Sequence, residues 1–537
     1  MTKLTFIGAC HEVTGSCFLL QTDNLNILID CGMKQGSSTL QSIDLPVNES
    51  QIDYVLLTHA HIDHSGNLPL LYKKGFRGKV LCTNGTKQLC EIMLRDSAFI
   101  QMSDAEWINK RNKRSGKDLI EPAYDIDDAD NVLKHFEGHN YDELFPIEDG
   151  YRNITIKFID AGHLLGSSSI YVNLYTEGNG YKTLLFSGDI GNNNQPLIQN
   201  PVYPDDADYV IMESTYGNRN HEKPSDYIFL LSDIINDTFD RGGNLVIPAF
   251  AVGRTQEFLY FIREIKEKKL VKNQNFKVYL DSPLANEATT IYDKTALEYC
   301  NYETRELIKK GINPIIFDGL IRTSSIEDSI KITTDPEPKI IISAAGMCDA
   351  GRIRHHLKHN LWKKECTVLF VGYQANGTLG RLILDGADTV RIFGEDIKVS
   401  AKIIQFPGIS AHADQDGLCD WVNNLLTKPY KVFIVHGDEE SAMGFCNTLK
   451  NVYKLDAEIP YSGAYLDLST GEFENAIPRT ITTAIYGGGY SMNRYISKLF
   501  EVYEKLGDTI HLYENGTNED VKKFTTQIND LIERWED

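Results

Sequence analysis

Residues 58–66 read Thr-His-Ala-His-Ile-Asp-His-Ser-Gly and directly follow the apolar segment 54–57. Three imidazoles and one carboxylate therefore lie within residues 59–64, just after an expected strand. Burying such a cluster costs a large desolvation free energy unless a ligand uses its polar atoms. Imidazole and carboxylate together suit zinc, with manganese or iron less favoured. The His-x-His-x-Asp-His spacing thus predicts a metal-binding loop at a strand end.

Further ligands are needed, because one loop cannot complete two metal sites. Segments 162–163, 187–189 and 435–437 each place a histidine or an aspartate after an apolar strand. Alone, each is more often a structural residue, but with residues 59–64 they form a specific set. Two metal ions about 3.5–4 Å apart can share a hydroxide and a carboxylate, which lowers the pKa of the bound water. The predicted ligands are His59, His61, His163 and Asp189 for one ion, and Asp63, His64, Asp189 and His436 for the other, with Asp189 as the bridge.

The rest of the chain predicts an α/β protein. Short apolar runs that end in glycine turns predict strands in the N-terminal part, followed by a helix at 86–102 and a charged, helical stretch at 103–148. Within that stretch the basic segment 107–117 is expected to be a solvated helix end or loop. From about residue 224, helices alternate with almost continuously apolar strands, which is typical of a parallel sheet covered on both faces.

This change of rhythm, and its reversal near residue 400, predicts one domain inserted into another. The expected domains are 1–213 and 403–475 for the two parts of the outer domain, 214–402 for the insert, and 476–537 for a helical C-terminal extension of unknown role, with helices near 491–506 and 518–535. The composition agrees with a cytoplasmic protein, because no apolar run spans a bilayer and the start lacks a signal peptide. The ten scattered cysteines contain no CxxC pair and are expected to be free thiols.

The segments that carry the predicted ligands also resemble a known family. HAHIDHSG (59–66), GHLLGS (162–167), FSGDIG (186–191) and IVHGDEE (434–440) resemble the ligand motifs of the metallo-β-lactamase superfamily, in order. The insert resembles the β-CASP branch, which cuts nucleic acids, through ESTYGNRNH (213–221), PAFAVGRTQE (248–257), LDSPLA (280–285), SAAGMCDAGR (343–352), GYQANGTLGR (372–381) and GISAHADQ (408–415). The resemblance runs from residue 3 to about 470. It implies a metallo-β-lactamase αββα sandwich with an inserted parallel-sheet β-CASP domain.

The resemblance also implies residues for the chemistry. Glu213, His412 and His436 match the family's motifs A, B and C. Cleavage of a phosphodiester releases an alkoxide, so a positioned acid helps, and His412 is the candidate for that acid. Glu213 is expected to hold the tautomer of His412 and to raise its pKa. Asp63 is counted among the catalytic residues as well as the ligands.

Several polar residues are candidates for binding substrate. Ser410 and neighbouring glycines can bind phosphate through hydroxyl and N–H groups, and Arg254 lies at an expected helix start. Arg352 and Arg381 are similar candidates. For the three arginines a surface ion pair is an equally good alternative. His355, His356 and His359 are expected on a helix face, and His221 stays unassigned.

The function expected from these residues is hydrolysis of RNA phosphodiester bonds by two divalent ions, most simply zinc, with manganese as an alternative. Endonuclease and 5′-to-3′ exonuclease modes both stay open. The alternatives are a small-molecule ester or phosphodiester hydrolase of the same superfamily, a DNA nuclease, and a scaffold that has lost its metals. The net charge of −21 argues against nonspecific nucleic-acid binding, so recognition is expected to be local or assisted by a partner. A homodimer and a protein partner bound through the C-terminal extension are further expectations.

Overall fold

The computed structural model describes residues 2–35, 43–150, 152–222, 226–375, 377–477 and 522–527. Residues 1–37 and 42–478 form one compact unit, and nearly all of the described residues belong to it. Within the described residues, no helix is both long and apolar enough to cross a membrane.

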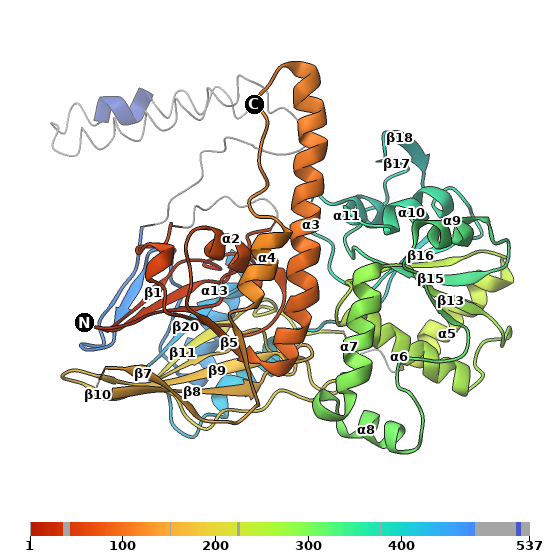
Figure 1. Ribbon diagram of the computed structural model, residues 1–537. Helices are drawn as coiled ribbons and strands as arrows, with labels where there is room; N and C mark the ends of the chain where they lie inside the picture. The colour runs from red at the N-terminus through yellow and green to blue at the C-terminus, as the bar shows by residue number, and fades with distance from the viewer. Residues whose placement is uncertain are drawn as a thin grey trace. The chain divides into compact units, whose positions relative to one another are not determined.

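Two mixed sheets form the centre of the outer domain (Figure 1). The strands of the first, in spatial order, are β23 (Phe473–Glu474), β22 (Tyr465–Asp467), β1 (Lys3–Phe6), β2 (Phe18–Gln21), β3 (Asn26–Ile29), β4 (Tyr54–Leu56), β5 (Lys79–Thr83) and β6 (Phe136–His139). Those of the second are β21 (Ala457–Glu458), β20 (Lys431–Val435), β11 (Tyr209–Glu213), β10 (Gly180–Phe186), β9 (Ser168–Thr176), β8 (Arg152–Asp160) and β7 (Phe145–Asp149).

Successive side chains along each strand point to opposite faces of the sheet, because a β-strand has a side-chain period of two residues. In β2, Phe18 and Leu20 join the core between the two sheets, whereas Leu19 joins the core on the outer face. The outer face of the first sheet is covered by α2 (Leu68–Lys73), α3 (Asn84–Ser115) and α4 (Ile126–Leu133). The outer face of the second is covered by α12 (Gln415–Asn423) and α13 (Glu439–Thr448). This layering is the expected αββα sandwich.

The inserted domain is built on a six-stranded sheet whose strand pairs are all parallel. Its order is β14 (Leu320–Arg322), β13 (Lys277–Leu280), β15 (Lys339–Ser343), β12 (Leu245–Pro248), β16 (Thr367–Phe370) and β19 (Lys402–Gln405). The helices are α5 (Tyr227–Asp240), α6 (Arg254–Glu267), α7 (Pro283–Tyr299), α8 (Tyr302–Lys309), α9 (Ile326–Thr334), α10 (Ile353–Asn360) and α11 (Leu379–Leu384), and a hairpin is formed by β17 (Thr389–Ile392) and β18 (Glu395–Lys398). They cover both faces of the sheet: α5 and α6 pack on one, α10 and α11 on the other.

The two domains share one apolar core. Leu89 and Met93 of α3 belong to the same buried cluster as Ile247 of β12 and Phe258 of α6. Helix α3 also packs directly against α7 of the insert. The insert is therefore held against the outer domain by continuous apolar packing.

The structure differs from the sequence expectations at two places. Residues 103–148 are not helical throughout, because β6 and β7 lie within them and extend the two sheets at their edges. Residues 403–405 belong to β19 and pair with β16, so the sheet of the insert extends past residue 402. The domain boundaries otherwise stay a prediction. Most of the helices expected near 491–506 and 518–535 lie outside the described residues; 522–527 are helical.

Candidate metal centre and active site

The predicted metal ligands lie at one edge of the two sheets. Strands β10, β11 and β20 are parallel neighbours, with Phe186 opposite Ile211 and Glu213 opposite Val435. Because parallel strands end at the same edge, Asp189, Glu213 and His436 emerge close together. Residues 58–64 follow β4 in the facing sheet, with α1 (Ile62–Ser65) formed inside the motif. His163 lies in the turn between β8 and β9.

His59, His61, His163 and Asp189 form the first ligand group. The Nε2 atom of His59 lies 3.1 Å from Nδ1 of His61 and 3.4 Å from Oδ2 of Asp189. Nε2 of His163 lies 3.2 Å from the same nitrogen of His61 and 3.6 Å from Oδ2 of Asp189. Three ring nitrogens and one carboxylate oxygen thus face a common point, which is a donor set that suits zinc.

Asp63, His64 and His436 form the second group. Oδ1 of Asp189 lies 3.3 Å from Nε2 of His64 and 3.6 Å from Nε2 of His436. Nε2 of His436 also lies 3.6 Å from Oδ2 of Asp63. Asp189 therefore turns one oxygen toward each group, as a bridging carboxylate does.

The polar atoms of this centre fit divalent metal ions. Nε2 of His64, Nε2 of His436 and Oδ1 of Asp189 are buried and have no hydrogen-bond partner among the described residues. Buried polar atoms are rarely left in that state unless a ligand uses them. Burial lowers the pKa of His59 and of His163 well below the ordinary value, which keeps both imidazoles neutral, as metal ligands must be.

The carboxylates of the centre are held in the ionised form. Burial opposes ionisation of Asp63, but His436 and His64 outweigh it and lower the pKa of Asp63 to about 2. Burial likewise opposes ionisation of Asp189, yet the surrounding imidazoles, His436 and His64 foremost, hold its pKa well below the usual range. The two acids can therefore supply negative charge to a bound cation over a wide pH range.

A second layer of residues orients the ligands, and the sequence analysis did not single it out. Oδ2 of Asp30 lies 2.7 Å from Nδ1 of His64, and Thr58 donates its N–H to Oδ1 of Asp30 at 2.8 Å. Oγ1 of Thr215 lies 3.1 Å from Nδ1 of His436. Such contacts fix which ring nitrogen faces the metal. Asp30 directly follows β3, so the sequence could have marked it as an acidic residue at a strand end, but not as the partner of His64.

His412 and Glu213 lie beside the first ligand group. Nδ1 of His412 is 3.1 Å from Oε1 of Glu213, and its Nε2 is 3.9 Å from Oδ2 of Asp189. Burial disfavours the imidazolium, but attraction by Glu213 and Asp189 outweighs it and raises the pKa of His412 to about 9. Glu213 is itself fixed by the N–H groups of Ile190 and Thr215, at 2.8 and 3.1 Å. Glu213 thus directs His412 toward Asp189 of the first ligand group and favours the imidazolium form.

The candidate substrate-binding residues are distributed differently. Ser410 lies two residues before His412 and accepts its N–H at 3.2 Å. Arg254 pairs with Glu257 and donates to the carbonyl of Ile409 at 3.3 Å, so it lies against the loop that carries His412. Arg254 thus forms an ion pair, but a largely buried one rather than a surface pair, because the two side chains are 8% and 12% exposed.

The other two arginines also form ion pairs, of which only the one made by Arg381 lies at the surface. Arg352 contacts Asp281 at 2.7 Å, and Arg381 contacts Asp385 at 2.9 Å. Asp281 is also bonded to the buried His356 of α10 at 2.7 Å. A substrate-binding role for these arginines stays a prediction.

His221, which the sequence left unassigned, lies next to the candidate acid. Its Nε2 atom is 3.0 Å from the carbonyl oxygen of His412, and its N–H donates to Oδ2 of Asp414 at 3.2 Å. These contacts connect the segment after β11 to the loop that carries His412. His221 therefore supports the position of that loop.

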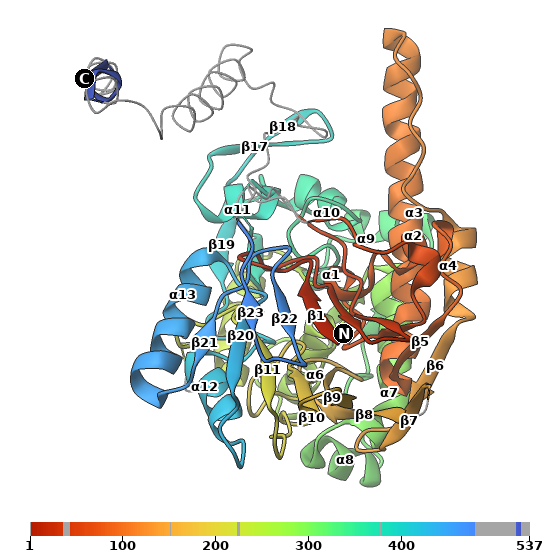
Figure 2. The ribbon, with the colours of Figure 1, turned by 90° about the vertical axis from the view of Figure 1, so that its left-hand side faces the viewer.

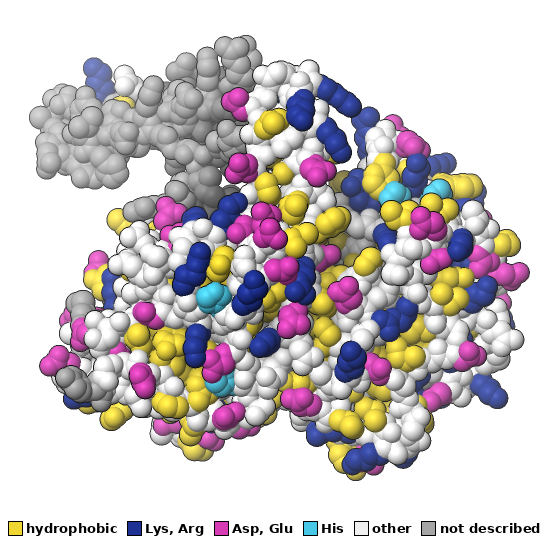
Figure 3. All heavy atoms as spheres, viewed as in Figure 1, with side chains coloured by type: hydrophobic (Ala, Val, Ile, Leu, Met, Phe, Trp, Pro, Cys, Tyr) yellow, Lys and Arg dark blue, Asp and Glu magenta, His cyan; other side chains and the backbone are white. Residues whose placement is uncertain are grey.

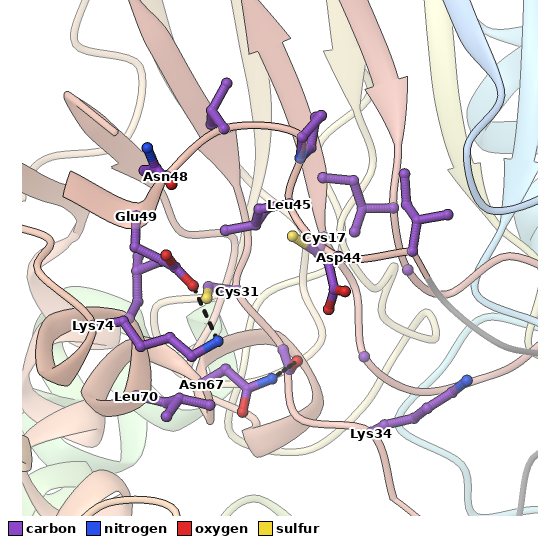
Figure 4. A pocket seen from close by; sticks show the side chains of 18 of the residues that line it. Cys17, Cys31, Lys34, Asp44, Leu45, Asn48, Glu49, Asn67, Leu70 and Lys74 are labelled. Carbon is purple, nitrogen blue, oxygen red and sulfur yellow. Dashed lines mark hydrogen bonds and ion pairs between the residues drawn. The ribbon is translucent and has the colours of Figure 1, made fainter. Parts of the chain in front are cut away.

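A pocket of about 670 Å³ lies behind the metal-binding loop (Figure 4). None of the predicted ligands lines it. Asn67 donates its side-chain N–H to the carbonyl of Gly32 at 2.7 Å, and Glu49 pairs with Lys74 at 3.0 Å across its wall. The N–H of Cys31 in turn donates to the carbonyl of His64. The pocket wall thus braces the metal-binding loop from outside.

Comparison with known proteins agrees with this geometry. Residues 12–151 match the family described as the metallo-beta-lactamase superfamily, 255–383 the Beta-Casp domain, and 396–460 the Zn-dependent metallo-hydrolase RNA specificity domain. A ribonuclease of Thermus thermophilus is 34% identical over 442 residues, which are 82% of this chain and 94% of that protein. The chain belongs to the β-CASP ribonuclease family of the metallo-β-lactamase superfamily.

Two archaeal relatives extend the comparison. A transcription termination factor of Methanosarcina mazei is 34% identical over 468 residues, which cover 84% of this chain and 70% of the relative. An RNase J-like protein of Methanocaldococcus jannaschii is 30% identical over 472 residues, which cover 87% of this chain and 100% of the relative. The similarity therefore includes both domains.

Proposed function

We propose that this protein is a metal-dependent ribonuclease that hydrolyses phosphodiester bonds of RNA. The observation that carries the proposal is the position of Asp189, whose two oxygens face two separate ligand groups, with the His412–Glu213 pair beside one of them. Relatives that this chain matches over most of its length are named as a ribonuclease and as an RNase J-like protein. The geometry of the site and the names of the relatives both favour hydrolysis of RNA phosphodiester bonds.

The protein groups would act as follows. His59, His61 and His163 would hold one divalent ion, and Asp63, His64 and His436 the other, with Asp189 shared between them. Two ions bound there would supply a water of lowered pKa and would neutralise charge on the phosphate. His412 would donate the proton from Nε2 to the departing oxygen, since its Nδ1 is held by Glu213. Glu213 would hold the other proton on Nδ1 and so leave Nε2 to act as the acid.

Finer properties follow as proposals. The two ions are zinc, with manganese as the alternative, because the donor atoms are imidazole nitrogens and carboxylate oxygens. We also propose a homodimer, a protein partner bound through residues 476–537, and a cytoplasmic location. Mass photometry and affinity capture with the full chain, with and without residues 476–537, test the first two.

The deciding experiment compares two labelled RNAs of one sequence, one with a 5′-monophosphate and one with a 5′-hydroxyl. Purified wild type and His412→Ala are assayed with zinc or manganese, and metal content is measured on the same preparations. Internal fragments from both RNAs, lost in a variant that keeps its metal, support an endonuclease. Mononucleotides from the 5′-phosphate RNA alone support an exonuclease. No cleavage by a metal-loaded wild type would refute the proposal.

A further inference from the structure

Helix α3 continues far beyond the core that its first half covers. Figures 1 and 2 both show its C-terminal half projecting past the neighbouring elements. Most of its buried residues lie before residue 99, and Ala105 is the last of them. The chain then turns at Gly116 and runs back along the helix, where Asn109 donates to the carbonyl of Ile120 at 2.8 Å. We call residues 103–121 the α3 arm.

One face of the arm carries an aromatic ring and three cations. Trp107, Lys110, Arg111 and Arg114 follow the spacing i, i+3, i+4 and i+7, so they lie on one side of the helix. All four are exposed, and Trp107 is 64% exposed. The opposite side holds Ala105, Asn109 and Asn112, which face the returning chain. The cationic face is therefore free to meet a partner.

The five basic side chains of the arm have no ion-pair partner among the described residues. They are Lys110, Arg111, Lys113, Arg114 and Lys117. Arg95, earlier on the same helix, is by contrast paired with Asp130 at 2.6 Å. Residues 107–117 carry five basic side chains and no acidic one, whereas Asp104, Glu106, Asp118 and Glu121 flank them within the arm. The whole chain has a net charge of −21, so the basic run at 107–117 is a local exception. Such a patch complements a polyanion.

The cationic face is turned toward the inserted domain. Asp96, Ser103, Trp107 and Lys110 lie along one line of the helix, at steps of seven, four and three residues. Helix α3 packs against α7 of the insert, and burial together with the carboxylate of Glu287 on α7 raises the pKa of Asp96 to about 6. Figure 3 shows Lys and Arg side chains gathered over the end of α3 on the side of the insert.

We propose that the α3 arm binds single-stranded RNA at a distance from the metal centre. Lys110, Arg111 and Arg114 contact successive phosphates, and a base stacks on the exposed ring of Trp107. This inference rests on the proposed ribonuclease function and adds a second contact site for the same substrate. It also explains how a strongly acidic protein holds a polyanion.

The length of the helix sets which RNAs reach the arm. The thiol of Cys90 interacts with the side chain of Ser65, the residue that follows His64. From Cys90 to Lys110 the helix rises by about 30 Å, at 1.5 Å per residue. A stacked strand covers that distance with about nine nucleotides, at 3.4 Å each. An RNA of about 5 nucleotides therefore cannot touch both sites, whereas one of about 30 can.

The test compares these two lengths in one cleavage assay with the full chain. The variant is Lys110→Gln/Arg111→Gln/Arg114→Gln. The control is Lys294→Gln/Lys309→Gln/Lys310→Gln, which removes the same charge from exposed positions on α7, at the last residue of α8 and at the residue after it. For the long RNA we expect the arm variant to raise KM about tenfold or more at low salt. The slope of log(kcat/KM) against log salt concentration should become less negative by about 2, because three phosphate contacts are lost.

The stacking contact is tested in the same way. Trp107→Ala should raise KM for the long RNA. Trp107→Phe should keep KM close to the wild-type value, because an aromatic ring is retained. All of these variants should cleave the short RNA like wild type. An unchanged KM and salt slope for the long RNA in the triple variant would overturn the inference, as would an equal loss on both RNAs. Wild type that cuts neither RNA would instead refute the ribonuclease function itself.

Discussion

The Nδ1 atom of His412 lies 3.1 Å from Oε1 of Glu213, and this contact joins a loop after the inserted domain to a strand that precedes it. The carboxylate orients the imidazole and favours its charged form. Neither residue belongs to the first ligand group, which consists of His59, His61, His163 and Asp189. Replacing either one therefore changes the candidate acid without removing a predicted ligand.

Glu213→Gln should lower kcat/KM for RNA about 10–100-fold while metal content stays that of wild type. Because Glu213 raises the pKa of His412, its loss should lower that pKa, and the acid would be deprotonated earlier as pH rises. The alkaline limb of the pH profile of kcat/KM should therefore move to lower pH. Rates measured across the alkaline range, beside metal analysis, check this. An unmoved alkaline limb would contradict the assigned role of Glu213.

Asp189→Asn should remove metal from both groups, because the two oxygens of Asp189 face different sets of ligands. Metal analysis should give clearly less than the wild-type content, and cleavage should disappear. His436→Ala is the comparison, since His436 belongs to the second group alone and its loss should leave the first group loaded. Equal metal content in the two variants would argue against a shared carboxylate.

Asp30→Ala should weaken metal binding at the second group about 10–100-fold, since Asp30 orients His64. Competition with a coloured chelator measures the affinity. Asp149→Ala provides a control, because Asp149 hydrogen-bonds Thr22 and Asn24 and contacts no ligand. If the Asp30 and Asp149 variants retain metal equally, the orienting role of Asp30 is wrong.

Asp160→Asn should make the fold less sensitive to pH. Burial raises the pKa of Asp160 from 3.8 to about 7, so the folded state favours the protonated carboxyl. The resulting stability is fully present below the unfolded pKa and is lost as pH rises through about 7, with a size on the order of 4 kcal/mol. The amide keeps the contact with the N–H of Gly162 and does not titrate.

The measurement is the thermal midpoint of both proteins over a pH range that spans the unfolded pKa of 3.8 and the folded pKa of about 7. Wild type should lose stability relative to Asp160→Asn as the pH increases. Parallel pH curves for the two proteins would show that Asp160 does not titrate as expected. Activity is not needed for this comparison, so it is independent of the proposed function.

The sequence predicted the parts of the molecule that depend on local patterns. The spacing of residues 59–64 places ligands within one turn, and the apolar runs at β8–β11 and β12–β16 are long enough to be recognised as strands. The shared position of Asp189, Glu213 and His436 also follows, because parallel strands end at one edge. The assignment of the fold to the metallo-β-lactamase and β-CASP families is confirmed.

The missed features depend on contacts between distant segments. β6 and β7 are short edge strands in a charged stretch, and only pairing with β5 and β8 defines them. β19 looks like its neighbours in sequence, yet it pairs with β16 of the insert. The roles of Asp30 and Thr215 likewise require knowing which histidine nitrogen each one meets. No local spacing contains that information.

The order of the ligands along the chain affects how the enzyme is made. Under the roles proposed here, residues up to Asp189 supply the first ligand group, but the acid at residue 412 and the last ligand at residue 436 come only after the insert. A chain still being translated has no complete centre until β20 has emerged and paired with β11. With these roles, the nascent protein would be unable to cut the message from which it is translated until almost all of its catalytic domain had been synthesised.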